Sequence, residues 1–118
     1  MSIPSISERV RFLQQNVYER GGSPATPDEI SAAVRQRGYS LSSSTIRAIL
    51  AGHVHQPSQA TLTALADYFL VPVSTFGDDP REWEKVHSFI SQYRQRIDAS
   101  PLAASRAWQR LRKKRFTI

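Results

Sequence analysis

The chain has 118 residues, of which 40% are apolar, and a formal net charge of +6. This length and apolar content suit one domain with a hydrophobic core. It contains no cysteine, which excludes disulfide bonds, thiolate metal sites and thiol catalysis. No apolar run approaches the roughly 20 residues that cross a bilayer, and the first residues lack the pattern of an export signal, so we expect a cytoplasmic protein without a membrane partner.

The positive charge is concentrated in the last third of the chain. Residues 1–79 hold six basic and seven acidic side chains, whereas residues 80–118 hold ten basic and three acidic ones. The C-terminal third is therefore the part that attracts a polyanionic partner over a distance. A nucleic-acid surface in the first two thirds has to rely on a few well-placed groups.

Helix start signals and apolar residues spaced three and four apart predict helices throughout, and no segment shows a convincing strand pattern. The first helix begins after Ser5, whose spacing from Glu8 is that of a capping box. The second begins with Thr26 as its cap and Glu29 three residues later, and Gly38 ends it. The apolar faces of these two helices are formed by Ile6, Val10, Leu13 and Val17, and by Ile30, Ala33 and Val34.

A third helix is expected between Ser42, its cap, and Gly52, its stop. Its apolar face contains Ile46, Ile49 and Leu50, and its opposite face contains Ser43, Ser44, Arg47, Ala48 and Ala51. A fourth helix begins after Ser58, and a short turn follows Pro72. These two elements are expected to bury Leu62, Leu65, Ala66, Phe69, Val73 and Phe76.

A further helix is predicted from Asp79 onward, with Pro80 at its first position and Glu82 completing the start signal. Its apolar residues alternate by three and four, which is the seam spacing of two helices packed side by side. A last helix beginning at Ser100 carries Trp108 on its apolar face.

The second and third helices have the properties of a helix-turn-helix: two short consecutive helices joined by a turn, the second with a small, polar outer face. We therefore expect the helix Ser42–Ala51 to lie in the major groove of double-stranded DNA. The residues expected to contact bases are Ser43, Ser44, Arg47 and Ala48. A bidentate contact from Arg47 to guanine would discriminate between bases by about 1–3 kcal/mol.

The segment "TPDEISAAVRQRGYSLSSSTIRAILAGHVHQPSQATLTALADYFLVPVSTF" resembles the Cro/repressor-type helix-turn-helix family, also called XRE or lambda-repressor-like. The matching positions are Ile46, Gly52, Pro57, Ser58, Leu62, Leu65, Ala66 and Val73. The turn "RQRGYSL" is longer than that of the phage repressors and is most similar to the EspR-type regulators of actinobacteria. The resemblance implies an all-α domain of about five helices plus one or two C-terminal helices, and DNA binding as a dimer through C-terminal helices.

The loop "GHVHQPS" contains a His-x-His pair. The resemblance implies that residues following the recognition helix contact the DNA backbone, and the N-terminus of the next helix points its free N–H groups into this loop. The residues expected to contact phosphates are Thr26, Ser42, Thr45, His53, His55, Gln56 and Ser58. Because imidazoles gain a proton near neutral pH, DNA affinity should depend on pH in that range.

Other interpretations of these residues remain. A zinc or copper site needs three or four ligands, and only the distant His87 is available besides the pair, so we expect no metal and no cofactor. The two histidines can also be solvated loop residues, and Arg47 a solvated helix residue. Residues 42–44 are serines without an evident base to activate them, and phosphate-binding glycine loops are absent, so we expect neither an enzyme nor a small-molecule substrate.

We divide the chain into a DNA-binding domain, residues 1–77, and a C-terminal helical segment, residues 78–118. The apolar stripe of the segment can pack on the first domain or on a second copy, and we favour a homodimer. The residues assigned to the dimer interface are Trp83, Val86, Ile90, Tyr93, Ile97 and Trp108. The stretch from Arg106 to Arg115 carries six positive charges, which form either a solvated helix end or a sequence-independent attraction for DNA.

The sequence thus predicts a sequence-specific DNA-binding transcriptional regulator of the bacterial nucleoid, with double-stranded DNA and a second copy as partners. Two alternatives remain. An antitoxin or adaptor would use the C-terminal helices to bind another protein and would copurify with it. A nucleoid-organising protein with weak sequence preference would bind random and selected DNA with similar affinity.

Overall fold

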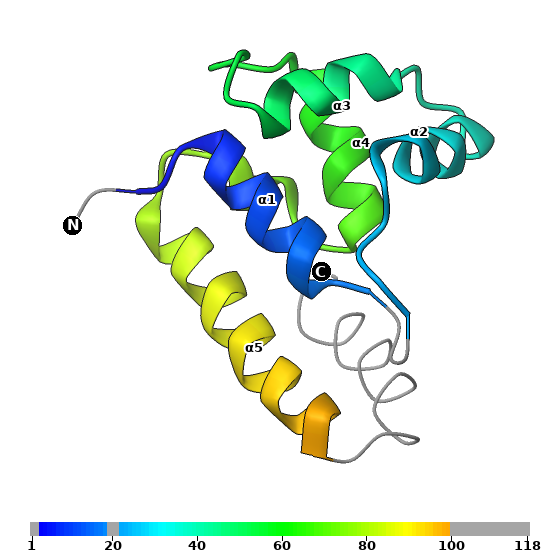
Figure 1. Cartoon of the computed structure of the whole chain (residues 1–118). Helices are drawn as coiled ribbons and strands as arrows, with labels where there is room; N and C mark the ends of the chain where they lie inside the picture. Colours follow the sequence, from blue (N-terminus) through cyan, green and yellow to red (C-terminus); the bar gives the residue numbers. More distant parts are fainter. Residues whose placement is uncertain (1–2, 19–21, 100–118) are drawn as a thin grey trace.

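A computed structural model gives the structure of the protein and describes residues 3–18 and 22–99, with side chains up to residue 94. As predicted, the described part is all-α and contains no strand. Its elements are α1 (Ile6–Asn16), α2 (Pro27–Gln36), α3 (Ser43–Leu50), α4 (Gln59–Phe69), the 3-10 turn η1 (Val73–Phe76) and α5 (Pro80–Ala99). The helix predicted to begin at Ser100 lies outside the described residues. Helix α1 lies between α5 on one side and α3 and α4 on the other (Figure 1).

The first four helices begin at the polar caps that the sequence predicts. The Ser5 hydroxyl accepts a hydrogen bond from the Glu8 N–H at 3.1 Å. At α2 the capping box is complete, because Thr26 Oγ1 accepts from the Glu29 N–H at 3.2 Å and Glu29 Oε1 accepts from the Thr26 N–H at 3.0 Å. The same cap-to-third-residue contact recurs at Ser42 with Thr45 and at Ser58 with Thr61.

Three helices end at a residue in the left-handed conformation. These residues are Gly38, Gly52 and Leu70, with φ of 95°, 82° and 56°. At the end of α3, the N–H groups of Gly52 and His53 donate to the carbonyls of Ile49 and Ala48, a Schellman motif. The two glycines act as the predicted stops. Leu70 was not predicted as one, because this conformation costs an ordinary residue about 1–2 kcal/mol.

One hydrophobic core joins all the helices, and most of the predicted core residues belong to it. The predicted residues that are buried in the first four helices and η1 are Val10, Leu13, Val17, Ile30, Val34, Ile46, Ile49, Leu62, Leu65, Ala66, Phe69 and Phe76. Ile6, Ala33 and Leu50 are only partly buried. The expectation for Val73 is wrong: its side chain is 41% exposed, because η1 turns Thr75 and Phe76 toward the core instead.

Helix α5 packs on α1 and η1 of the same chain. The side chains that line this contact are Trp83, Val86, Ile90 and Tyr93, each at most 6% exposed. The Phe12 ring of α1 meets the Trp83 indole edge to face, with centroids 5.5 Å apart. This corrects our assignment of these four residues to a dimer interface, since side chains enclosed by their own chain have little surface for a second copy. The side chains of Ile97 and Trp108 lie outside the described residues.

The start of α5 carries the predicted acidic cap. Asp79 Oδ1 accepts a hydrogen bond from the Arg81 N–H at 3.0 Å, and this bond, together with the Arg81 guanidinium, holds the pKa of Asp79 below its usual value.

Among the described residues, no helix combines the length and apolar character needed to cross a bilayer.

A buried arginine of α1 is hydrogen-bonded to η1 and to the residue after it, and no local pattern predicts this contact. Arg9 is 4% exposed, and its Nη1 donates to the carbonyls of Thr75 and Gly77, both at 2.9 Å. Burial lowers the pKa of Arg9, with Asp78 opposing the shift. An arginine guanidinium stays protonated in proteins, so the side chain remains a cation. Arg9 therefore links α1 to the segment that directly precedes α5.

Candidate nucleic-acid interface

Helices α2 and α3 are consecutive and in contact, with residues 37–42 between them. The Ser31 hydroxyl of α2 donates to the buried carbonyl of Leu41 at 2.7 Å, which ties the connecting turn to α2. Ile46 and Ile49 are fully enclosed and hold one face of α3 against the core. The opposite face of α3 points toward solvent, as the recognition helix of a helix-turn-helix does in the absence of DNA.

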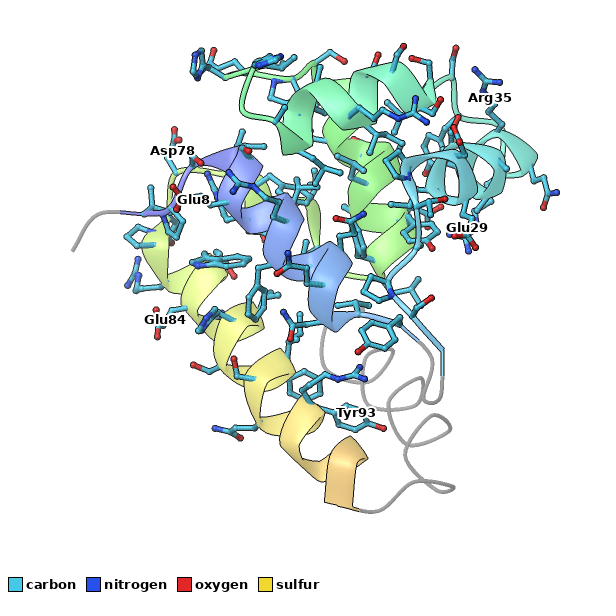
Figure 2. All side chains as sticks on the ribbon, viewed as in Figure 1. Glu8, Glu29, Arg35, Asp78, Glu84 and Tyr93 are labelled. Carbon is cyan, nitrogen blue, oxygen red and sulfur yellow. The ribbon has the colours of Figure 1, made fainter. Side chains whose placement is uncertain are left out.

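The outward face of α3 carries all four residues predicted to contact bases. Ser44 and Arg47 are exposed, and Ser43 and Ala48 are half-buried. Side chains project from α3 along the upper edge of the molecule, and Arg35 of α2 projects at the same end (Figure 2). The structure therefore brings the predicted base-contacting residues together on one accessible ridge.

Arg47 is held in place by two polar contacts. Its Nη2 donates to Asp28 Oδ1 at 3.0 Å, and its Nη1 donates to Ser43 Oγ at 3.4 Å. The Arg47 and Asp28 side chains remain 55% and 71% exposed. Asp28, in the first turn of α2, was not among the predicted residues. No local signal pairs positions 19 apart, and only the packing of α2 on α3 brings them together.

The residues predicted to contact phosphates lie near both ends of α3. Thr26, Ser42 and Thr45 are at the N-terminal ends of α2 and α3, where Thr26 and Ser42 accept capping hydrogen bonds. The others are exposed and lie in or next to the loop after α3: His53, His55, Gln56 and Ser58. This distribution suits a recognition helix whose ends are fixed by backbone contacts while its middle reads bases.

The loop after α3 lies beside the first turn of α1. The Ser7 hydroxyl donates to the Leu50 carbonyl at 3.3 Å, and Arg11 Nη2 donates to Ser7 Oγ at 3.1 Å. Arg11 and His55 line a hollow of about 150 Å³ between the two segments. Arg11 thus adds a positive charge beside the loop. No sequence pattern predicts this position of Arg11, because nothing in the sequence places the start of α1 next to residues 52–55.

Within residues 3–18 and 22–94, the His-x-His pair does not belong to a cluster of potential metal ligands. Among the described residues, no group of three or more histidines, cysteines, aspartates or glutamates is placed to hold a metal ion. Its nearest surroundings are instead those of the loop: the exposed side chains of Gln56 and Ser58 and the hollow next to Arg11.

The chain is similar to a nucleoid-associated protein of mycobacteria. No protein-family model matches the chain. The nucleoid-associated protein EspR of Mycobacterium tuberculosis, from strain CDC 1551 / Oshkosh and from strain ATCC 25618 / H37Rv, is 32% identical to it over 75 residues. The match covers 64% of this chain but only 57% of each relative. The chain is therefore similar to a nucleoid-associated protein over little more than half of that protein's length, in agreement with the EspR-type resemblance of the sequence.

Proposed function

We propose that the protein is a sequence-specific, DNA-binding transcriptional regulator of the Cro/repressor-type helix-turn-helix family, with α3 in the major groove. The observation that carries this proposal is the outward face of α3, where small and polar side chains surround the exposed Arg47. The similarity to nucleoid-associated EspR supports a role on bacterial DNA. The proposal places the protein at the nucleoid in the cytoplasm, with neither catalytic residues nor a cofactor.

In this mode of binding, the middle of α3 reads bases and its two ends meet the backbone. Arg47 donates to a guanine, the hydroxyls of Ser43 and Ser44 reach neighbouring base edges, and Ala48 lies against a thymine methyl group. Phosphates are bound near one end of α3 by Thr26, Ser42 and Thr45, and near the other by His53, His55, Gln56 and Ser58. The free N–H groups at the start of α4 face the same phosphate as the loop.

We also propose that the protein acts as a homodimer, with residues 1–77 carrying the DNA surface and residues 78–118 the contact between copies. Because the stripe on α5 is enclosed by its own chain, the contact has to use other surface, with Ile97 and Trp108 as its apolar members. A two-fold dimer presents its recognition helices about 34 Å apart to half-sites one helical turn apart. Analytical ultracentrifugation at micromolar concentration tests this, and a monomer over that range would contradict it.

The similarity to nucleoid-associated proteins supports a second candidate function. Both are nucleoid-associated proteins, so this protein can be a DNA-organising protein with little sequence preference. The two functions differ in one measurable quantity, the ratio of affinities for selected and random DNA.

Selection of bound sequences from a random DNA pool tests the proposal directly. We expect the wild-type protein to enrich one motif, and Arg47→Ala to lose the preference at one base pair, at a cost of about 1–3 kcal/mol in discrimination. Arg81→Ala is the matched control, since it removes an exposed arginine of α5. If the wild-type protein enriches no motif, the regulator is excluded and the DNA-organising function is favoured.

A further inference from the structure

The ion pair between Asp28 and Arg47 joins two helices at the candidate DNA surface. Ser43, one turn earlier on α3, and Asp28, from the first turn of α2, contact different terminal nitrogens of the same guanidinium. An arginine side chain ordinarily samples many rotamers, and a bidentate base contact requires one orientation of its planar fork. The two contacts restrict that orientation before any DNA is present.

The contacts orient the guanidinium without hiding it. A guanidinium has five N–H donors, and these two hydrogen bonds use two of them. More than half of the Arg47 side chain is exposed, at 55%. Donors therefore remain available for a base edge while the pair with Asp28 is intact.

Asp28 also places a negative charge on a surface that faces phosphates. A carboxylate in this position repels DNA unless a cation neutralises it. While Arg47 contacts a base from its held position, the carboxylate stays paired. When Arg47 turns instead toward a phosphate, as in sequence-independent binding, Asp28 is left unpaired beside the DNA. The ion pair therefore disfavours sequence-independent binding to phosphates more than it disfavours base recognition.

We propose that Asp28 is a positioning residue, which fixes Arg47 for base recognition and weakens sequence-independent binding. This inference rests on the proposed function and deepens it, because it names a residue outside the recognition helix that sets the specificity of the helix. Asp28 acts through Arg47 and needs no contact with DNA of its own.

The test compares Asp28→Asn with the wild-type protein and Arg47→Ala in selection from a random pool, followed by binding to selected and random duplexes at several salt concentrations. We expect Asp28→Asn to lose at least about threefold of the discrimination at the base pair that Arg47→Ala identifies. We also expect affinity for random DNA to rise about two- to fivefold, with the salt slope steeper by up to about 0.9, because Arg47 becomes free to contact a phosphate. A merely structural role for Asp28 would not produce these two opposite changes.

Two further variants separate positioning from charge. Asp67→Asn removes the negative charge from another aspartate–arginine pair, that of Asp67 with Arg37 at 3.4 Å, and should keep the wild-type base preference. Asp28→Glu keeps the charge and should restore most of the discrimination. Circular dichroism confirms that each variant is folded, as expected because the side chains of Asp28 and Asp67 are 71% and 38% exposed.

The other outcomes overturn the inference in distinguishable ways. If Asp28→Asn discriminates as well as or better than the wild-type protein, while Arg47→Ala does not, Asp28 does not position Arg47 and the proposed function stands. If Asp67→Asn changes discrimination as Asp28→Asn does, net charge is the cause and positioning is excluded. If the wild-type protein enriches no motif, the proposed function fails and this inference fails with it.

Discussion

At the scale of single residues, burial decides what an arginine does in this protein. Arg9 is 4% exposed, and its guanidinium donates hydrogen bonds to two backbone carbonyls of its own chain. Arg47 is 55% exposed and is held by one aspartate and one serine, with donors left over. The first is a structural cation, and the second is suited to recognising a partner.

We expect Arg9→Met to lower the free energy of unfolding by about 2–4 kcal/mol, because methionine fills part of the space but leaves the carbonyls of Thr75 and Gly77 without a donor. Urea denaturation followed by circular dichroism measures the change. Arg11→Met, at an exposed position of the same helix, should stay within about 0.5 kcal/mol of the wild-type value. Equal changes in the free energy of unfolding for the two substitutions would show that the hydrogen bonds of Arg9 do not stabilise the fold.

If the two exposed histidines of the loop after α3 contact phosphates, as we propose, the DNA affinity depends on pH. A protonated imidazole attracts phosphate, and it loses its charge as the pH rises through neutrality. We expect DNA affinity to fall between about pH 6 and 8, and to fall less for the double variant His53→Gln, His55→Gln. Fluorescence anisotropy across this range measures it, and superimposable pH profiles would remove the histidines from the phosphate contacts.

At the scale of elements, short polar signals determine where helices begin, and packing determines how they are used. Thr26 and Glu29 complete a capping box at the start of α2, which is also the end of α2 that carries Asp28. A well-defined first turn therefore fixes the position of the carboxylate that holds Arg47.

Thr26→Ala should lower the free energy of unfolding by about 1 kcal/mol, because it removes the acceptor for the Glu29 N–H. Glu29→Gln is the matched control, since glutamine also completes a capping box. Thermal denaturation distinguishes the two. A Thr26→Ala protein as stable as the wild type would mean that solvent replaces the cap at no cost.

The sequence predicts the elements of this fold better than it predicts the contacts between them. Caps such as Ser42 and stops such as Gly52 are local, so their types and positions reveal them. Leu70 ends α4 in a conformation that its residue type disfavours, and no sequence signal announces it. The pairing of Asp28 with Arg47 likewise depends on how α2 lies against α3. The stripe on α5 was correctly predicted as a packing surface but assigned to the wrong partner, because periodicity does not say which chain covers it.

At the scale of the whole molecule, α5 belongs to the same core as α2 and α3. A buried aromatic or large aliphatic side chain contributes about 1.5–3 kcal/mol, and a domain is stable by only about 5–15 kcal/mol in total. The four enclosed side chains of α5 together therefore rival the whole stability of the fold. The division between residues 1–77 and 78–118 is one of proposed function, and within the described residues α5 shares its core with the first part.

We expect a fragment of residues 1–77 to lose cooperative thermal unfolding, because the face of α1 that α5 covers becomes exposed. A fragment of residues 1–99 keeps α5 and is the matched control, which should unfold cooperatively. Circular dichroism and calorimetry measure both fragments. A cooperative transition for residues 1–77 near that of residues 1–99 would show that α5 adds little to the fold.

Deleting residues 106–118 should flatten the dependence of DNA affinity on salt, since it removes six positive charges that can displace counterions from DNA. The slope of the logarithm of affinity against the logarithm of salt concentration measures this. An unchanged slope would mean that these charges do not approach the DNA. The deleted residues lie outside the part of the chain that the structure describes.

The 20 residues of α5 make a rod about 30 Å long. Contacts between this rod and the end of α1 extend at least to Arg94, which donates to the Asn16 carbonyl at 3.1 Å and lies 4.0 Å from the centroid of the Tyr18 ring. A tilt of about 10° at the base of such a rod would displace its tip by about 5 Å. One base pair of DNA rises by about 3.4 Å, so this displacement exceeds one step along an operator. For two copies joined near that tip, the stiffness of the seam between α1 and α5 would govern which spacing of half-sites they can bridge.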